Sequence, residues 1–173
     1  SSWLNGGLFG AAPFEYSTTG SPTVATHGVY TSVTFTGSGS LTVTAGSRIA
    51  DVLLVAGGGG ANSGGSSSGG AGAGGFRTEA VPLSVASGSS GVHTVTIGAG
   101  GGVSTNGDDT VFTDATSATG GGRSGGTTGS LALAGGCGGG GNGSTNTVTE
   151  VGAAGSQGGD GGDGLRHGPW DMA

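Results

Sequence analysis

An apolar run that ends directly in a series of glycines limits most strongly how this chain can fold. The stretch DVLLVAGGGG (residues 51–60) opens the region that holds most of the chain's 47 glycines. Ordering a glycine costs about 0.5–1 kcal/mol more than ordering an alanine, because glycine has more conformational freedom to lose. The region is therefore either disordered, or its missing side chains let neighbouring backbones pack closely enough to offset that cost.

Hydropathy and charge argue against disorder of the whole chain. Disordered chains combine low hydrophobicity with high net charge, whereas this chain has a mean hydropathy of +0.05 and a formal net charge of −6. The stretch 60–75 taken alone has the composition of a flexible linker, but strand-like segments interrupt the glycines at intervals. At 173 residues the chain is expected to form one domain.

Several segments have the residue pattern of β-strands. The stretch 29–46 (VYTSVTFTGSGSLTVTAG) alternates along its length and is expected to form a hairpin that turns at 37–39. The continuous apolar run in DVLLVA predicts a strand covered on both faces. Further strands are expected in FRTEAVPLS, where Pro82 restricts the strand to an edge or a bulge, and in GVHTVTIGAGG, DDTVFTD, GSLALAGG and NTVTEVG. No segment shows a helical period, so the sequence predicts an all-β fold.

Ordered glycine runs can pack as threefold helices of the polyproline II type, with three residues per turn and a rise of about 3.1 Å. Such helices have no internal hydrogen bonds, so each N–H must find a carbonyl on a neighbouring run. The stretch 155–166 (GSQGGDGGDGLR) repeats every three residues, although such a period also arises by chance in low-complexity sequence. We expect one row, Gln157, Asp160, Asp163 and Arg166, to face water, and the other two rows to face neighbouring helices.

No combination of residues predicts an active site. The chain has no lysine and four scattered arginines, which makes nucleic-acid binding unlikely. No apolar stretch approaches the length of a membrane span, and no leader with a basic and then an apolar segment is recognisable. Cys137 is the single cysteine, and neither a phosphate-binding loop nor a nucleophile elbow is present. We therefore expect no enzymatic activity and no cofactor.

The remaining motifs favour structural roles. The stretch 158–166 matches one unit of the calcium-binding nonapeptide, but a solitary unit leaves calcium with too few ligands. His93 lies in a predicted strand and is expected to pack on the sheet, far in sequence from the other histidines. Asp108 and Asp109 are typical of a turn. Asn142 begins a glycosylation sequon, which means little without a secretory signal.

The N-terminal 28 residues concentrate the aromatic side chains of the chain. Such a cluster either lies across the chain's own core or is buried in a neighbouring subunit. We expect a docking arm at 1–28, a glycine-rich β and polyglycine domain at 29–168, and a tail at 169–173. The residues expected to dock are Trp3, Leu8, Phe9 and Phe14.

The order of these elements resembles the glycine-rich domain of phage virion proteins. The segments LLVAGGGG, GGAGAGGFR, VHTVTIGAGG and STNGDDTVF carry the resemblance, which covers about Val29 to Gly164. Such domains occur in tail-fibre tips, in adhesins and in small surface proteins of marine and cyanobacterial phages. The resemblance implies a small β-sheet or sandwich fused to a sandwich of packed polyglycine II helices. Similar glycine runs occur in some receptor kinases, so the fold alone does not fix the function.

The resemblance implies a non-enzymatic virion structural protein, which we expect to be made in the host cytoplasm without a signal peptide, and the lack of a coiled coil or long shaft favours a small surface protein over a whole tail fibre. It would be a multi-copy capsid decoration, knob or appendage component, bound to other virion proteins through its N-terminal segment. The alternative is a receptor-binding tail-fibre tip whose loops contact the host surface through Ser66, Asn106 and Asp108. A second alternative is an ice- or carbohydrate-binding module with flat Thr/Gly faces. None of these readings involves a metal, nucleic acid or membrane insertion.

Overall fold

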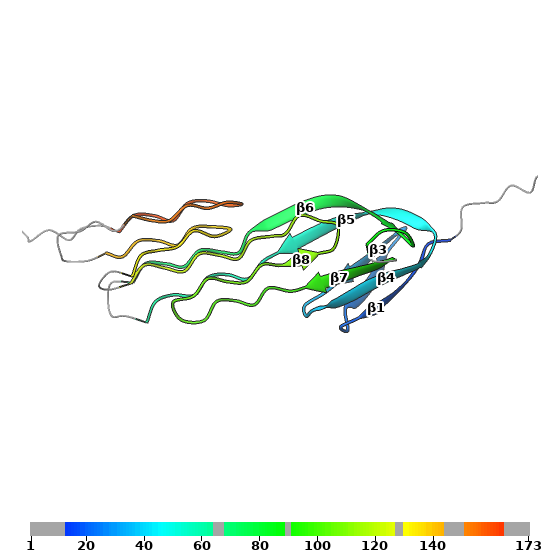
Figure 1. Cartoon of the computed structure of the whole chain (residues 1–173), viewed down its shortest axis with the longest axis horizontal. Coiled ribbons are helices and arrows are strands. Elements are labelled where there is room, and N and C mark those ends of the chain that lie inside the picture. The colour runs from blue at the N-terminus through cyan, green and yellow to red at the C-terminus, as the bar shows by residue number, and fades with distance from the viewer. Residues whose placement is uncertain (1–12, 64–67, 89–90, 127–129, 144–150, 165–173) are drawn as a thin grey trace, which may run out of the picture.

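The protein is elongated, with its β-strands at one end and long extended runs at the other (Figure 1). This computed structural model describes residues 13–63, 68–88, 91–126, 130–143 and 151–164, and this part of the chain contains no α-helix, 3₁₀ helix or π-helix. The predicted all-β class is confirmed. The strands are β1 (Glu15–Thr19), β2 (Thr23–His27), β3 (Tyr30–Thr34), β4 (Gly39–Ala45), β5 (Ser47–Val55), β6 (Phe76–Ser84), β7 (Val92–Thr96) and β8 (Val111–Phe112).

The apolar core lies between a four-stranded sheet and a two-stranded ribbon. The sheet has the order β1-β4-β7-β8, and β5 pairs with β6 to form the ribbon, all antiparallel. The side chains buried between them are Leu41, Val43, Val95 and Phe112 from the sheet, and Leu54, Val81 and Leu83 from the ribbon. The strands expected around 76–84, 92–96 and 111–112 are therefore confirmed, with Pro82 in an edge strand of the ribbon.

The predicted hairpin at 29–46 is wrong. β3 pairs with β2, and β4 lies between β1 and β7 instead. The turn Gly28-Val29 joins β2 to β3, and Gly28 has a φ of +63°, the conformation that a tight hairpin turn requires at its first position. This short connection gives β3 a nearer partner than β4. The segment 35–38 connects β3 in one sheet to β4 in another.

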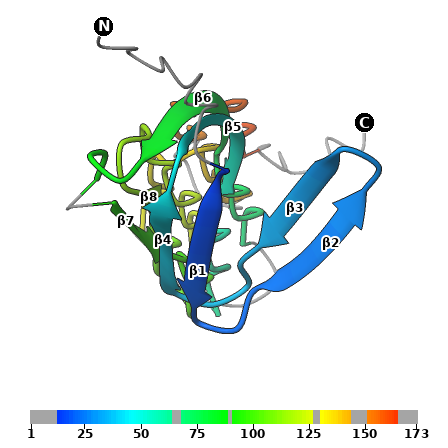
Figure 2. The same cartoon turned by 90° about the vertical axis from the view of Figure 1, so that its right-hand side faces the viewer.

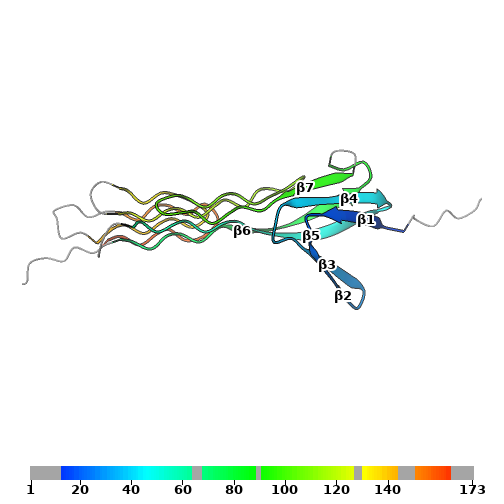
Figure 3. The ribbon, with the colours of Figure 1, turned by 90° about the horizontal axis from the view of Figure 1, so that it is seen from below.

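The hairpin of β2 and β3 projects sideways from the rest of the molecule (Figures 2 and 3). We call residues 23–34 the arm, a name that from here on refers to this hairpin and not to the docking segment expected at 1–28. Among the described residues, its two strands pair only with each other. Its base is fixed by the half-buried Phe35, which packs against the core. The arm therefore contributes little to the core of its own chain.

The predicted burial of DVLLVA on both faces is also wrong. Val52 and Leu54 face the core, whereas Ile49, Leu53 and Val55 are 75%, 62% and 58% exposed. The ribbon covers the core from one side only, so alternate side chains of β5 point outward. A continuous apolar run alone does not reveal this difference. Phe76 lies opposite Val55 in the register, and we call Ile49, Leu53, Val55 and Phe76 the ribbon face.

Beyond the strands, the chain runs back and forth along the long axis of the molecule (Figures 1 and 3). We call these extended runs together the glycine bundle. They lie at 56–62, 69–75, 98–102, 105–109, 119–126, 130–134, 136–142, 151–155 and 157–163. The strand expected in GSLALAGG is one of these runs, and most of NTVTEVG lies outside the described residues.

Hydrogen bonds along the run 56–62 change partner with a period of three residues. Residues 56 and 59 donate to the run 69–75, residues 57 and 60 donate to residues 108 and 105, and residues 58 and 61 accept from residues 101 and 104. The N–O distances lie between 2.8 and 3.1 Å. A threefold helix with neighbours on three sides requires this period. The predicted packing of polyglycine II helices is confirmed.

Hydrogen exchange should reveal the bundle directly. The amides from Gly136 to Gly141 donate in turn to residues 120, 73, 159, 133, 70 and 162, which belong to several different runs. We expect these six successive amides to exchange slowly, because none opens without separating runs. The measurement is amide exchange followed by NMR on the folded chain. Exchange at the rate of an unfolded peptide across 136–141 would contradict the bundle.

Candidate functional site

Polar side chains complete the hydrogen bonding of the bundle. Asp109 Oδ1 accepts from Gly120 N at 2.8 Å, and Asn106 Oδ1 accepts from Arg123 N at 2.9 Å. The two accepting side chains are three residues apart in one run, and the two donating amides are three residues apart in an antiparallel run. The same contact is therefore repeated on two successive turns of the threefold helix. These side chains satisfy amides that no backbone carbonyl reaches.

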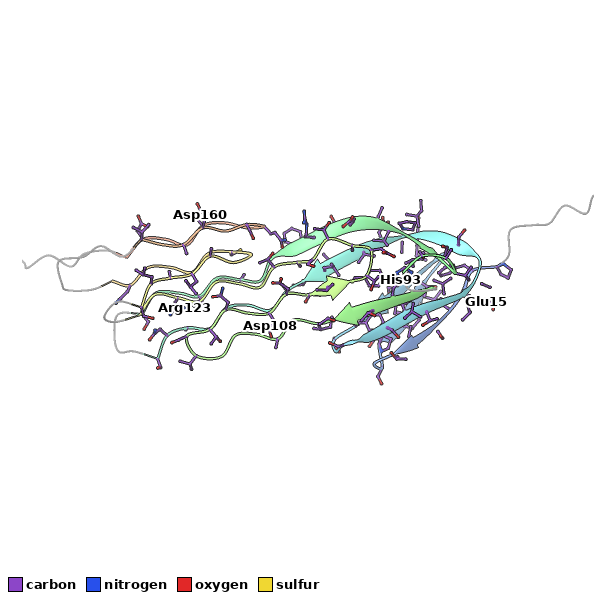
Figure 4. All side chains as sticks on the ribbon, in the orientation of Figure 1. Glu15, His93, Asp108, Arg123 and Asp160 are labelled. Carbon is purple, nitrogen blue, oxygen red and sulfur yellow. The ribbon has the colours of Figure 1, made fainter. Side chains whose placement is uncertain are left out.

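The predicted polar row at the C-terminal side of the bundle has the same role. Asp160 and Asp163 are exposed, as the sequence predicts, but their carboxylates also bind backbone. Asp160 Oδ1 accepts from Gly155 N at 2.8 Å, and Asp163 Oδ1 accepts from Gly152 N at 2.9 Å. Figure 4 shows Asp160 on the outermost pair of runs. Arg166 lies outside the described residues.

Removing both carboxylates should loosen the outermost runs. In the double variant Asp160→Ala/Asp163→Ala, we expect the amides of Gly152 and Gly155 to exchange faster, because they lose their acceptors. The double variant with Asn at both positions is the matched control, since its amide oxygens still accept hydrogen bonds. The measurement is residue-resolved amide exchange. Equal exchange rates in the Ala and Asn variants would show that the carboxylates do not cap these runs.

The residues predicted to dock the chain are only partly visible. Trp3, Leu8 and Phe9 lie outside the described residues. Phe14 is half-buried and packs against the chain's own core, with its ring centroid 5.9 Å from that of Tyr16. β1 pairs with β4 and β2 pairs with β3, so the part of the segment 1–28 that the structure describes includes two strands of the β end.

Of the three residues predicted to contact a receptor, the structure describes Asn106 and Asp108. Ser66 lies outside the described residues. Asn106 is exposed, but its side-chain amide also donates to Ala134 O at 3.1 Å, so both of its polar groups bind the bundle. Asp108 is exposed near the middle of the long axis (Figure 4). The chain reverses direction at 102–105, at the far end of the bundle, and Asp108 lies three residues beyond this reversal.

One cluster at the β end has the residue types of a catalytic triad. His93 is fully buried and stacks on Phe112, with ring centroids 5.4 Å apart. Its Nε2 lies 3.1 Å from Ser87 Oγ, and its Nδ1 lies 3.5 Å from Asp114 Oδ2 without a hydrogen bond. Figure 4 shows His93 among the strands. The sequence analysis missed this cluster because 27 positions separate Ser87 from Asp114, and it predicted only that His93 packs on the sheet, which is confirmed.

The hydrogen bonds of this cluster are those of a structural clamp. Ser87 Oγ lies 2.8 Å from Ser84 O, which can only accept, so the hydroxyl proton points away from His93. Asp114 Oδ2 accepts from Gly88 N at 2.7 Å. A nucleophilic serine needs its proton directed at the base and its oxygen open to a substrate. The cluster instead fixes the turn between β6 and β7.

Within the described residues, no group of three His, Cys, Asp or Glu side chains is placed to hold a metal ion. Asn142, the sequon asparagine, is buried and donates from Nδ2 to Gly126 O at 2.9 Å. No helix in the described part of the chain could cross a bilayer.

Comparison with protein families agrees with this architecture. A family model described as a glycine-rich domain matches residues 31–170. The chain belongs to the glycine-rich domain family. The match of the glycine-rich domain begins inside β3, so it includes the whole bundle and excludes β1 and β2. Searches of curated proteins and of solved structures gave no match.

Proposed function

We propose that this glycine-rich domain protein is a non-enzymatic structural component of a bacteriophage particle, displayed on its surface as a decoration, knob or appendage component. The observation that supports this proposal is the bundle, in which backbone groups of each run form hydrogen bonds with at least two other runs. Proteolytic nicking concentrates at exposed, weakly bonded loops, so a body built of bonded backbone resists it. Such resistance suits a protein displayed outside a particle. The resemblance to glycine-rich domains of phage virion proteins supports the proposal that the particle is a bacteriophage.

The β end is the proposed attachment side. The described chain begins there, at Pro13, and the bundle extends away from it (Figure 1). The preceding segment, with Trp3, Leu8 and Phe9, would bind a capsid or appendage protein through its apolar side chains. This arrangement leaves the bundle pointing outward.

The test is to locate and count the chain on purified particles. Quantitative mass spectrometry should find it in many copies per particle, and electron cryomicroscopy should find elongated projections attached by their β end. A few copies at the end of a tail fibre would favour a receptor-binding tip instead. Absence from purified particles would contradict the proposal.

One observation favours the tip as second candidate. Two exposed apolar side chains lie toward the far end of the bundle: Val103 in the turn 102–105, and Leu131 in the run 130–134. A surface at the outermost point of a projection is well placed to meet a host cell. Replacing residues 102–105 with a Gly/Ser turn should then abolish adsorption while leaving the particle intact. Normal adsorption of this variant would contradict a role of the chain as a receptor-binding tip.

A further inference from the structure

The arm lacks the support that a two-stranded hairpin needs. Isolated hairpins are at best marginally stable in water, and they gain independent stability by packing against a third strand or another element. Within the described residues, β2 and β3 pair only with each other. Val24 and Tyr30 are 50% and 76% exposed. An additional surface is therefore expected to cover the arm.

The arm also lacks the features that keep exposed strands apart. Natural edge strands avoid pairing with other chains by carrying charged residues, especially lysine, or by bulges. The arm (TVATHGVYTSVT) has no Asp, Glu, Lys or Arg, and its register runs from Thr23–Thr34 to His27–Tyr30 without a bulge. Within the described residues neither edge of the arm pairs with another strand, and most of its side chains are exposed, with Ala25 and Val33 half-buried.

The ribbon face has matching chemistry, and no described residue covers it. Its four apolar side chains are each more than half exposed, and Asp51 lies in the same outward row between Ile49 and Leu53. In the arm, Val24 and Val33 are cross-strand partners on one face, and Thr26 and Thr31 adjoin them on that face. Valines and threonine methyls suit the apolar part of the ribbon face, and the threonine hydroxyls can donate to the carboxylate.

We propose that the arm of one copy of this chain packs on the ribbon face of a second copy. The chain carries both halves of the contact, and neither half is covered within the described residues. Because the two halves are different surfaces, the contact is head-to-tail and each copy uses its arm and its face at once. Repetition builds a ring if the rotation closes, and a filament if it does not. This inference does not depend on the proposed function.

The test uses variants at exposed positions, so that the fold is unaffected. Val24→Asp/Thr26→Asp charges the arm, and Leu53→Asp charges the ribbon face. Wild-type protein should sediment as an oligomer, and each variant alone as a monomer, with association weakened at least about tenfold because a carboxylate would be buried unpaired. Val103→Asp, at the equally exposed far end of the bundle, is the matched control and should remain oligomeric.

Mixing the two variants distinguishes this contact from others. The arm variant keeps an intact ribbon face, and the face variant keeps an intact arm, so an equimolar mixture should form one-to-one dimers and nothing larger. Failure of the mixture to combine would overturn the proposal. So would a monomeric wild type, whose ribbon face would then be covered by residues 1–12 or by a different protein. An oligomeric Leu53→Asp variant would point to arm-to-arm pairing and would also overturn it.

Discussion

Replacing Gly121 with alanine is expected to destabilise the protein strongly. Gly121 is buried in the bundle, and a Cβ at this position would lie closer than 3.0 Å to Gly72 O, Gly59 N and Ala73 O. All three are backbone atoms of two neighbouring runs, so no side chain can rotate away. Overpacking a core costs about 1–3 kcal/mol, and the strained hydrogen bonds add about 1 kcal/mol each.

We expect a loss of about 3 kcal/mol or more in the free energy of unfolding, which corresponds to a fall of roughly 6–12 °C in Tm. Differential scanning calorimetry is the measurement. Gly162→Ala is the matched control, because a Cβ there has open space around it and the residue is exposed. Its expected effect is neutral to slightly stabilising, since alanine lowers the entropy of the unfolded chain. Equal losses in both variants would mean that steric closeness is not what selects glycine.

Replacing His93 with alanine is the second large effect, at the opposite end of the molecule. The substitution removes a fully buried ring that stacks on Phe112 and bonds to Ser87 Oγ. Truncating a large core side chain leaves a cavity, and the expected loss is about 2–4 kcal/mol in the free energy of unfolding. Denaturant unfolding followed by circular dichroism measures it.

A control on the same strand separates burial from strand propensity. Thr94 is the next residue of β7 and faces solvent, so Thr94→Ala should change stability by less than about 0.5 kcal/mol. A fully stable His93→Ala variant would contradict the clamp. In that case the Ser87, His93 and Asp114 cluster would have to be tested for hydrolysis of ester substrates.

The bundle was predictable because it depends on the abundance of glycine, which is visible in the composition. Closely spaced glycines can become ordered by packing as threefold helices, and the period of three in 155–166 indicates this packing. The same period was present, and missed, in the spacing of Asn106 and Asp109, which bind backbone at successive turns. Polar residues three apart beside glycine runs therefore indicate capped amides as well as a face toward water.

The pairing of the strands was less predictable because local pattern does not select partners. The segment 29–46 alternates as a hairpin should, yet Gly28 gives β3 a closer partner in β2. Burial on one or both faces depends on the number of layers, which the apolar run in β5 does not encode. The cluster around His93 depends on contacts between distant segments, and no spacing in the sequence indicates it.

The period of three also sets which changes in length this molecule can accept. Inserting one or two residues within a run rotates everything beyond it by a third or two thirds of a turn, which would bring side chains to positions where only a bare backbone fits, such as Gly121. An insertion of three residues preserves the phase. Insertions in the turns between runs do not change this phase, because the turns lie beyond the last hydrogen bonds between neighbouring runs. Insertions and deletions of any length should therefore be found in the turns at the two ends of the bundle, whereas the runs should change in length only by multiples of three residues.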